Sequence, residues 1–249
     1  MTGPDSPSPD SDSRRPDSAE ARQLLARSVL GQGLEIGPGD NPFPLPPGAT
    51  AQSVDQWAPQ DNAKLFREIE ATRFQRADFL IDLNTERLSA FADQSQDFII
   101  ASHVLEHLVE PVGQLADIYR VLRPGGTLLL LLPDRRRTFD RDRRPTPLLH
   151  LVDEYQRGVT ELDDAHLIEF TSHVAEDWGP ARPPKDQAER FDRHRRRSIH
   201  VHCWYDDEFA EVLLYLIENL GIQWELIDRL GVDDVPDGME FGIALRRST

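Results

Sequence analysis

Residues 33–41, GLEIGPGDN, decide the fold that this sequence predicts. A short apolar run leads into two closely spaced glycines, Gly37 and Gly39. This pattern predicts a strand whose end turns tightly and brings its backbone close to a ligand. Asp55 follows 18 residues after Gly37, at the end of the next apolar run, where a carboxylate can accept hydrogen bonds from a ribose. A glycine turn with a purely structural role is the alternative at this point.

The loop after the turn narrows the choice of ligand. It contains four prolines before Ala51, namely Pro42, Pro44, Pro46 and Pro47. A regular helix cannot start in such a segment, whereas dinucleotide folds aim a helix N-terminus at the pyrophosphate. The loop therefore disfavours NAD and FAD and favours a nucleoside ligand without phosphates.

Short apolar runs and helical patterns alternate along the rest of the chain, which is typical of a parallel α/β sheet. Helices are predicted at about residues 19–28, over 114–122 and over 206–220, the last two with their apolar residues on one face. Seven strands are predicted, over residues 33–36, 51–55, 79–82, 98–102, 127–132, 224–229 and 239–245.

Residues 33–133 resemble the class I S-adenosylmethionine-dependent methyltransferases, most closely the UbiE/type 11-like group. The resemblance rests on Glu35 with the glycine turn, on Asp55, on Asp82 in FLIDLN, on DFIIASH at 97–103 and on YRVLRPGGTL at 119–128. It implies a Rossmann-like, doubly wound seven-stranded sheet with an antiparallel last strand. It also implies S-adenosylmethionine as cofactor, bound by Glu35, Gly37, Pro38, Gly39, Asp55, Asp82, Leu83, Ser102 and His103. The sequence departs from the family pattern at Asn41, where many members have a third glycine.

The segment 134–202 differs in composition from the rest. It has 14 basic and 14 acidic residues and six of the eight histidines, whereas the whole chain has a net charge of −16. We predict four parts, with this segment as a cap and substrate insertion between the fifth strand and the last long helix. The other parts are a disordered tail (1–18), the cofactor-binding half (19–133), and the last helix and two strands (203–249).

Histidines supply the candidate general bases. In IHVHCW at 199–204 the residues alternate, so His200 and His202 are predicted to share one face of a strand. We predict His150 and His200 as the first candidates, followed by His202 and His103. There are two alternatives for these histidines. One is a divalent metal that His200 and His202 bind with His150 or a carboxylate, and the other is a purely structural role. We predict no metal ligand. The stretch also resembles that of methyltransferases from polysaccharide and natural-product pathways.

Two further classes of function compete with methyl transfer. His103, Glu106 and His107 spell the H-x-x-E-H signature of zinc hydrolases, which on a helix would put both histidines on one face. That hypothesis gives no role to the glycine turn or to Asp55, and we interpret His107 as a structural helix residue instead. The second competitor is a non-catalytic protein that binds S-adenosylmethionine.

The expected reaction is methyl transfer to a hydroxyl of a small metabolite such as a sugar or natural-product intermediate, with an amine as the second choice. The arginines of the insertion suit an anionic acceptor. Alternatively, they belong to a solvated loop and bind no substrate. These arginines are Arg135, Arg136, Arg137, Arg141, Arg143, Arg144, Arg190, Arg193, Arg195, Arg196 and Arg197.

The remaining expectations concern partners and location. The net charge of −16 disfavours nucleic acid as a partner. No apolar run approaches the ~20 residues that span a bilayer, and no secretory signal opens the chain. A single cysteine, Cys203, suits a reducing cytoplasm. The oligomeric state stays open, with a homodimer as one alternative.

Overall fold

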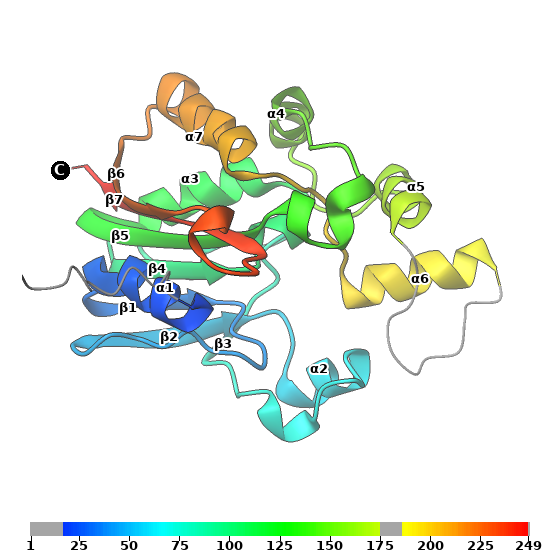
Figure 1. Ribbon diagram of the computed structural model, residues 1–249, viewed down its shortest axis with the longest axis horizontal. Coiled ribbons are helices and arrows are strands. Elements are labelled where there is room, and N and C mark those ends of the chain that lie inside the picture. The colour runs from blue at the N-terminus through cyan, green and yellow to red at the C-terminus, as the bar shows by residue number, and fades with distance from the viewer. Residues whose placement is uncertain (1–16, 175–185, 249) are drawn as a thin grey trace, which may run out of the picture.

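The structure, a computed structural model, describes residues 17–174 and 186–248. Within this part of the chain the predicted apolar runs form one seven-stranded sheet with the order β3-β2-β1-β4-β5-β7-β6 (Figure 1). The strands are β1 (Gly31–Ile36), β2 (Ala49–Asp55), β3 (Phe79–Leu80), β4 (Gln96–Ser102), β5 (Leu122–Pro133), β6 (Trp224–Leu230) and β7 (Glu240–Arg247).

The strand directions decide where a ligand can bind. Strands β1 to β5 pair in parallel, and β7 pairs antiparallel with both β5 and β6. The predicted antiparallel last strand and the Rossmann-like fold class are thus confirmed. Strands β2 and β4 lie on either side of β1. The chain therefore continues from β1 to β2 on one side and later crosses to β4 on the other side. A crevice is expected beyond the carboxyl ends of the strands at such a switch point.

Helices cover both faces of the sheet (Figure 1). The helices are α1 (Ser18–Leu25), α2 (Pro59–Leu65), α3 (Pro111–Val121), α4 (Leu148–Arg157), α5 (Asp164–His173), α6 (Gln187–Arg197) and α7 (Asp206–Leu220). The bounds of α7 match the prediction, whereas α3 starts three residues earlier than predicted. It does so because Pro111 takes the first helical position and Glu110 accepts a hydrogen bond from the Gly113 N–H.

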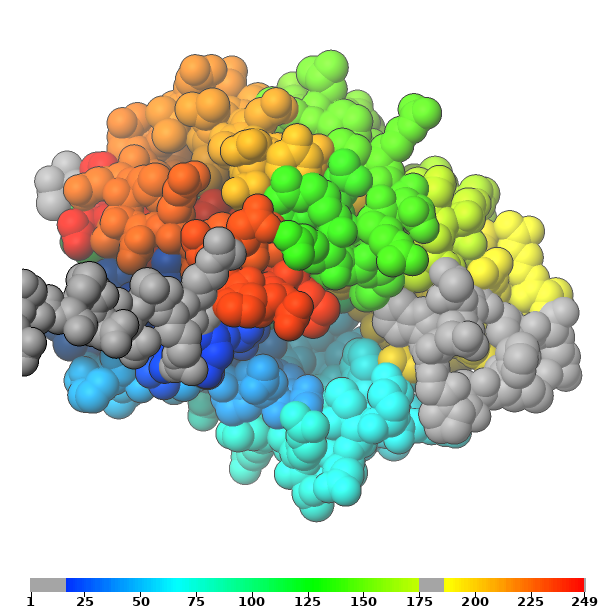
Figure 2. All heavy atoms as spheres, in the orientation of Figure 1, coloured from blue at the N-terminus to red at the C-terminus, as the bar shows by residue number. Residues whose placement is uncertain are grey.

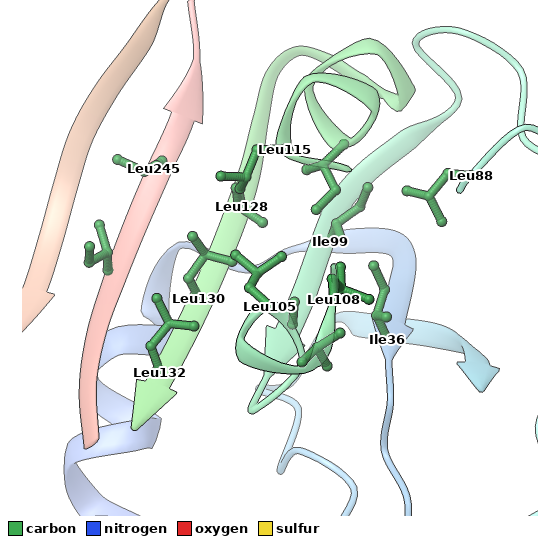
Figure 3. Close-up of a cluster of buried hydrophobic side chains, with 14 of the residues drawn as sticks. Ile36, Leu88, Ile99, Leu105, Leu108, Leu115, Leu128, Leu130, Leu132 and Leu245 are labelled. Atoms are coloured by element: carbon green, nitrogen blue, oxygen red, sulfur yellow. The ribbon is translucent and has the colours of Figure 1, made fainter. Parts of the chain in front are cut away.

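Strand β5 lies at the centre of the two hydrophobic clusters that cover the faces of the sheet. Leu128, Leu130 and Leu132 point to the face covered by α3 and α7, where Leu115 packs (Figure 3). The alternating residues Leu129 and Leu131 pack on the opposite face with the end of α1. A strand buried on both faces is rigid, so the loops that leave its carboxyl end start from fixed positions.

Two predicted features of the chain are wrong. Residues 199–204 form no strand apart from a single bridge between Trp204 and Asp134. Strand β3 ends at Leu80, two residues before its predicted end, because the chain turns at Asp82. The predicted tail 1–18 lies outside the described residues except for Asp17 and Ser18, which cap and begin α1.

The segment between β5 and α7 forms α4, α5 and α6 and lies at the right-hand end of the molecule, beyond the carboxyl end of β5 (Figure 1). Its described residues add no strand to the sheet. Among the described residues, no helix combines the length and the apolarity needed to span a membrane.

Candidate functional site

The glycine turn at the end of β1 has the geometry that only glycine adopts readily. Gly37 and Gly39 have φ angles of +64° and +51°, in the left-handed region. A Cβ on Gly37 would lie 2.8 Å from Cγ2 of Val104, which follows β4. Residues 37–48, all of them described, form no helix. This confirms the prediction that no regular helix starts in the proline loop.

A cavity of about 360 Å³ lies beyond the carboxyl ends of β1, β2 and β4. Its volume falls within the range of ~300–1,000 Å³ that is typical of small-molecule sites. Seven of the predicted site residues line it: Gly37, Gly39, Asp55, Asp82, Leu83, His103 and His200. The fold therefore brings residues from five different segments of the chain to one cavity.

Asp55 and Asp82 have the same local arrangement. Oδ1 of Asp55 accepts a hydrogen bond from the Trp57 N–H at 3.2 Å, and Oδ1 of Asp82 accepts one from the Asn84 N–H at 3.0 Å. Within the described chain, Oδ2 of each accepts none. Each carboxylate is thus oriented by its own loop and keeps one oxygen for a ligand.

Three predicted cofactor residues do not line the cavity, namely Glu35, Pro38 and Ser102. Glu35 is buried, and its carboxylate accepts a hydrogen bond from the Phe43 N–H at 2.5 Å. Burial raises the pKa of this carboxyl, and the Phe43 N–H opposes that rise. The contact ties the proline loop to β1, so Glu35 acts on the shape of the loop.

The segment after β4 is not the helix that the zinc hydrolase hypothesis needs. His103 has a φ angle of +54°, and only a 3-10 turn at Leu105–His107 follows. His107 ends this 3-10 turn, where its Nδ1 lies 2.8 Å from the Ile199 carbonyl oxygen, and it also lines the cavity. Glu106 is fully buried, 3.5 Å from Nδ1 of His103.

An ion-pair network holds His103 at the edge of the cavity. Its Nε2 lies 2.7 Å from Oε2 of Glu240 on β7, and Arg22 of α1 donates two hydrogen bonds to the same carboxylate. Burial opposes ionisation of Glu240, but Arg22 and His103 outweigh it and lower the pKa of Glu240 to about 2. The carboxylate is therefore charged at neutral pH.

His200 pairs with a buried aspartate that the sequence analysis did not find. Its Nδ1 lies 2.5 Å from Oδ2 of Asp140, and Arg143 donates to the other oxygen of Asp140 at 2.7 Å. Burial raises the pKa of Asp140, but His200 and Arg143 together outweigh burial and lower it. Arg143 also donates to the carbonyls of His200 and Val201, so this segment is firmly held.

His150 and His202 do not line the cavity. Both lie in a separate cluster with Glu154 and His166 inside the insertion. The prediction that His200 and His202 share a strand face fails because the backbone around them is not extended as a strand. His200 faces Asp140 and the cavity, whereas His202 is buried against Glu154.

Most of the arginines of the insertion pair with carboxylates nearby. Arg136 pairs with Asp134, Arg137 with Asp233, Arg141 with Asp142, Arg143 with Asp140 and Glu169, Arg195 with Asp164, Arg196 with Asp192 and Arg197 with Glu68. Of the arginines that we singled out, Arg193 and Arg197 line the cavity. The Arg197–Glu68 pair joins α6 to the segment after α2. Figure 2 shows that segment in cyan, beside the green and yellow insertion.

The cavity is also lined by residues that the sequence analysis did not select. They come from the loops after β2 and β3 and from the insertion: Trp57, Asn62, Asn84, Phe139, Phe170 and His194. No motif or spacing marks them, because they meet only when the insertion folds back over the sheet.

Residues 34–130 match the model of a family described as a methyltransferase domain. No curated protein matches the chain. A solved structure titled as a putative Zn-dependent alcohol dehydrogenase from Rhodobacter sphaeroides is 14% identical, with a TM-score of 0.54 over 94% of this chain and 90% of that one. At this identity the likeness shows a shared fold and nothing about activity.

Two other solved structures have lower TM-scores. A possible histamine N-methyltransferase from Thermotoga maritima is 15% identical, with a TM-score of 0.46 over 92% of this chain and 89% of that one. An S-adenosylmethionine-dependent methyltransferase from Aquifex aeolicus is 13% identical, with a TM-score of 0.44 over the same shares. The family match therefore assigns residues 34–130, which run from β1 to β5, to a methyltransferase domain.

Proposed function

We propose that this enzyme transfers a methyl group from S-adenosylmethionine to a hydroxyl oxygen of a small acceptor. The acceptor binds between the carboxyl ends of the strands and the insertion, and His200 takes the hydroxyl proton. The observation that carries the proposal is the Asp140–His200 pair, with its 2.5 Å separation, at the cavity wall.

The cavity fits S-adenosylmethionine, a cofactor that presents a nucleoside and no phosphate. Gly37 leaves no room for a Cβ beside Val104, so the backbone is the surface offered to the ligand. Asp55 and Asp82 each keep one carboxylate oxygen for hydroxyl or amino groups. These residues would hold the nucleoside, and the bound cofactor supplies a methyl group on a positively charged sulfonium.

The acceptor side of the cavity is formed by the insertion. Phe139 and Phe170 provide apolar surface, and the guanidinium groups of Arg193 and Arg197 also line this side. The Arg197–Glu68 pair joins the insertion to the segment after α2 at this cavity. Walls of this kind favour a small acceptor that has both an apolar part and an anionic group over a polymer.

The hydrogen bond to Asp140 decides which nitrogen of His200 can act as a base. Since Nδ1–H donates to the carboxylate, Nε2 carries the lone pair and can accept a proton. A hydroxyl is a weak nucleophile, so a positioned base contributes about 10²–10⁴-fold to its reaction. An amine or carbon nucleophile would need this base less, which is why the pair favours an oxygen acceptor.

A screen with isotope-labelled methyl donor tests the proposal. We expect the enzyme to label hydroxylated small molecules, such as sugars and phenols, in preference to matched amines. The variant His200→Gln should lower kcat by about 10²–10⁴-fold and leave the Kd for S-adenosylmethionine unchanged. His173→Gln is the matched control, because His173 is an exposed histidine of the same insertion that does not line the cavity.

Labelling confined to amines, or full activity of His200→Gln on a hydroxyl acceptor, would show that the proposal is wrong. Binding of S-adenosylmethionine with no transfer to any compound in the screen would favour the non-catalytic alternative.

A further inference from the structure

Four metal-ligating side chains meet inside the insertion, away from the cavity. His150 and Glu154 lie one turn apart on α4, His166 lies on α5, and His202 lies between α6 and α7. One ligand atom from each lies within 4.8 Å of all the others. Three segments that are distant in sequence thus converge on one point.

The separations between these atoms match those around a tetrahedral ion. Oε1 of Glu154 lies 3.3 Å from Nε2 of His150 and 3.1 Å from Nε2 of His166. Oε2 of Glu154 lies 3.4 Å from Nε2 of His202. Ligands held at about 2.0–2.1 Å from zinc in tetrahedral geometry are about 3.3 Å apart, so an ion fits with little movement.

Hydrogen bonding alone leaves this cluster unsatisfied. Glu154 is 1% exposed, and neither of its carboxylate oxygens accepts a hydrogen bond. His202 is fully buried; its Nδ1 has no partner, and its Nε2 reaches only the Val109 carbonyl oxygen, at 3.4 Å. A buried charge of this kind is paired or coordinates a metal in folded proteins, because leaving it unpaired is costly.

The surroundings of His166 are those of a metal ligand. Its Nδ1 lies 2.8 Å from Oδ1 of Asp163, which fixes that nitrogen as the donor. Nε2 therefore turns its lone pair toward the cluster, where Nε2 of His150 lies 3.0 Å away. A carboxylate that orients a histidine in this way is a regular neighbour of metal-bound histidines.

We propose that His150, Glu154, His166 and His202 bind one structural zinc ion. Three imidazoles and a carboxylate form a donor set that zinc accepts, and four protein ligands leave no open position for a substrate. The ion ties α4 and α5 to the segment before α7. Since His202 follows His200 by two residues, the ion also fixes the backbone that carries the proposed base.

The chain of 249 residues, purified without chelator, tests the proposal directly. Elemental analysis should find about one zinc per chain, as a closed four-ligand site predicts. Removal of the metal should lower the Tm by about 5–10 °C. This is the shift expected for a chain of this size when it loses a ligand whose free concentration is about 100 times its Kd. Cobalt added to the stripped protein should give the absorption bands of a tetrahedral ion.

Two pairs of variants locate the ion. Glu154→Gln and His166→Gln should lose the zinc and the cobalt bands. Their controls, Asp153→Asn and His173→Gln, should keep both, because these residues lie on the same two helices but outside the cluster.

The proposal is wrong if the wild-type chain takes up neither zinc nor cobalt and keeps its Tm with chelator. This measurement decides the question even if the variants fail to fold. It is also wrong if the cobalt bands survive in Glu154→Gln and His166→Gln, since the ion then lies elsewhere, as at Glu106, His107 and His200. Either result leaves the proposed methyl transfer to be judged by its own screen.

Discussion

Replacing Asp55 by alanine tests where the nucleoside of the cofactor lies. The carboxylate is half-buried at the end of β2, in the cavity wall, with Oδ1 bound to the Trp57 N–H at 3.2 Å and Oδ2 free of partners within the described chain. Hydrogen bonds to a charged group contribute about 1.5–3 kcal/mol. The Kd for S-adenosylmethionine should therefore rise by about 10- to 150-fold.

Isothermal titration calorimetry with S-adenosylmethionine and with its demethylated product measures this change. Asp55→Asn keeps an oxygen for the Trp57 N–H but replaces the free oxygen by an NH2 group that cannot accept a hydrogen bond from a hydroxyl, so it should also lose affinity while the loop keeps its own contact. Asp61→Ala is the matched control, because Asp61 pairs with Lys64 on the surface of α2 and does not line the cavity. If a folded Asp55→Ala protein binds with a change well below the tenfold that ~1.4 kcal/mol represents, the ribose is placed wrongly.

Three further predictions follow from the geometry. Asp140→Asn should lower kcat by about 10²–10⁴-fold in the labelled-methyl assay without changing cofactor affinity, because the amide no longer fixes the tautomer of His200; an unchanged kcat would contradict the assigned base. Gly37→Ala and Gly39→Ala each add about 1–2 kcal/mol of left-handed strain, but only the first also meets a neighbouring side chain, at 2.8 Å. Urea unfolding should therefore show the larger destabilisation for Gly37→Ala, and the opposite order would contradict the structure. Because the pKa of Glu240 is lowered to about 2, the charged carboxylate stabilises the folded state at any pH above the ordinary pKa of a glutamate. This stabilisation is lost as the pH falls from that ordinary pKa through about 2. Urea midpoints at low and neutral pH should differ less for Glu240→Gln than for the wild type, and equal differences would contradict this role.

The sequence alone determined the sheet and the turn that faces the ligand. The patterns that predict strands and helices involve only residues that are near one another in the sequence. Strand β5 is buried on both faces, so its residues form one apolar run that the sequence shows directly. Gly37 and Gly39 are needed by local backbone geometry, and the prolines after them exclude a helix. Asp55, at the end of β2, was predicted from its spacing after Gly37, and Asp82, two residues after β3, was predicted from the family resemblance; both line the cavity.

Only the tertiary structure decided how the histidines are divided. His200 and His202 are two residues apart, yet one faces Asp140 and the cavity while the other joins Glu154 and His166. Asp140 is 60 residues from His200, and pairings over such separations depend on how the insertion packs, which no local pattern records. The sequence therefore supplied the groups for chemistry, and the packing of α4, α5 and α6 decided which of them meet.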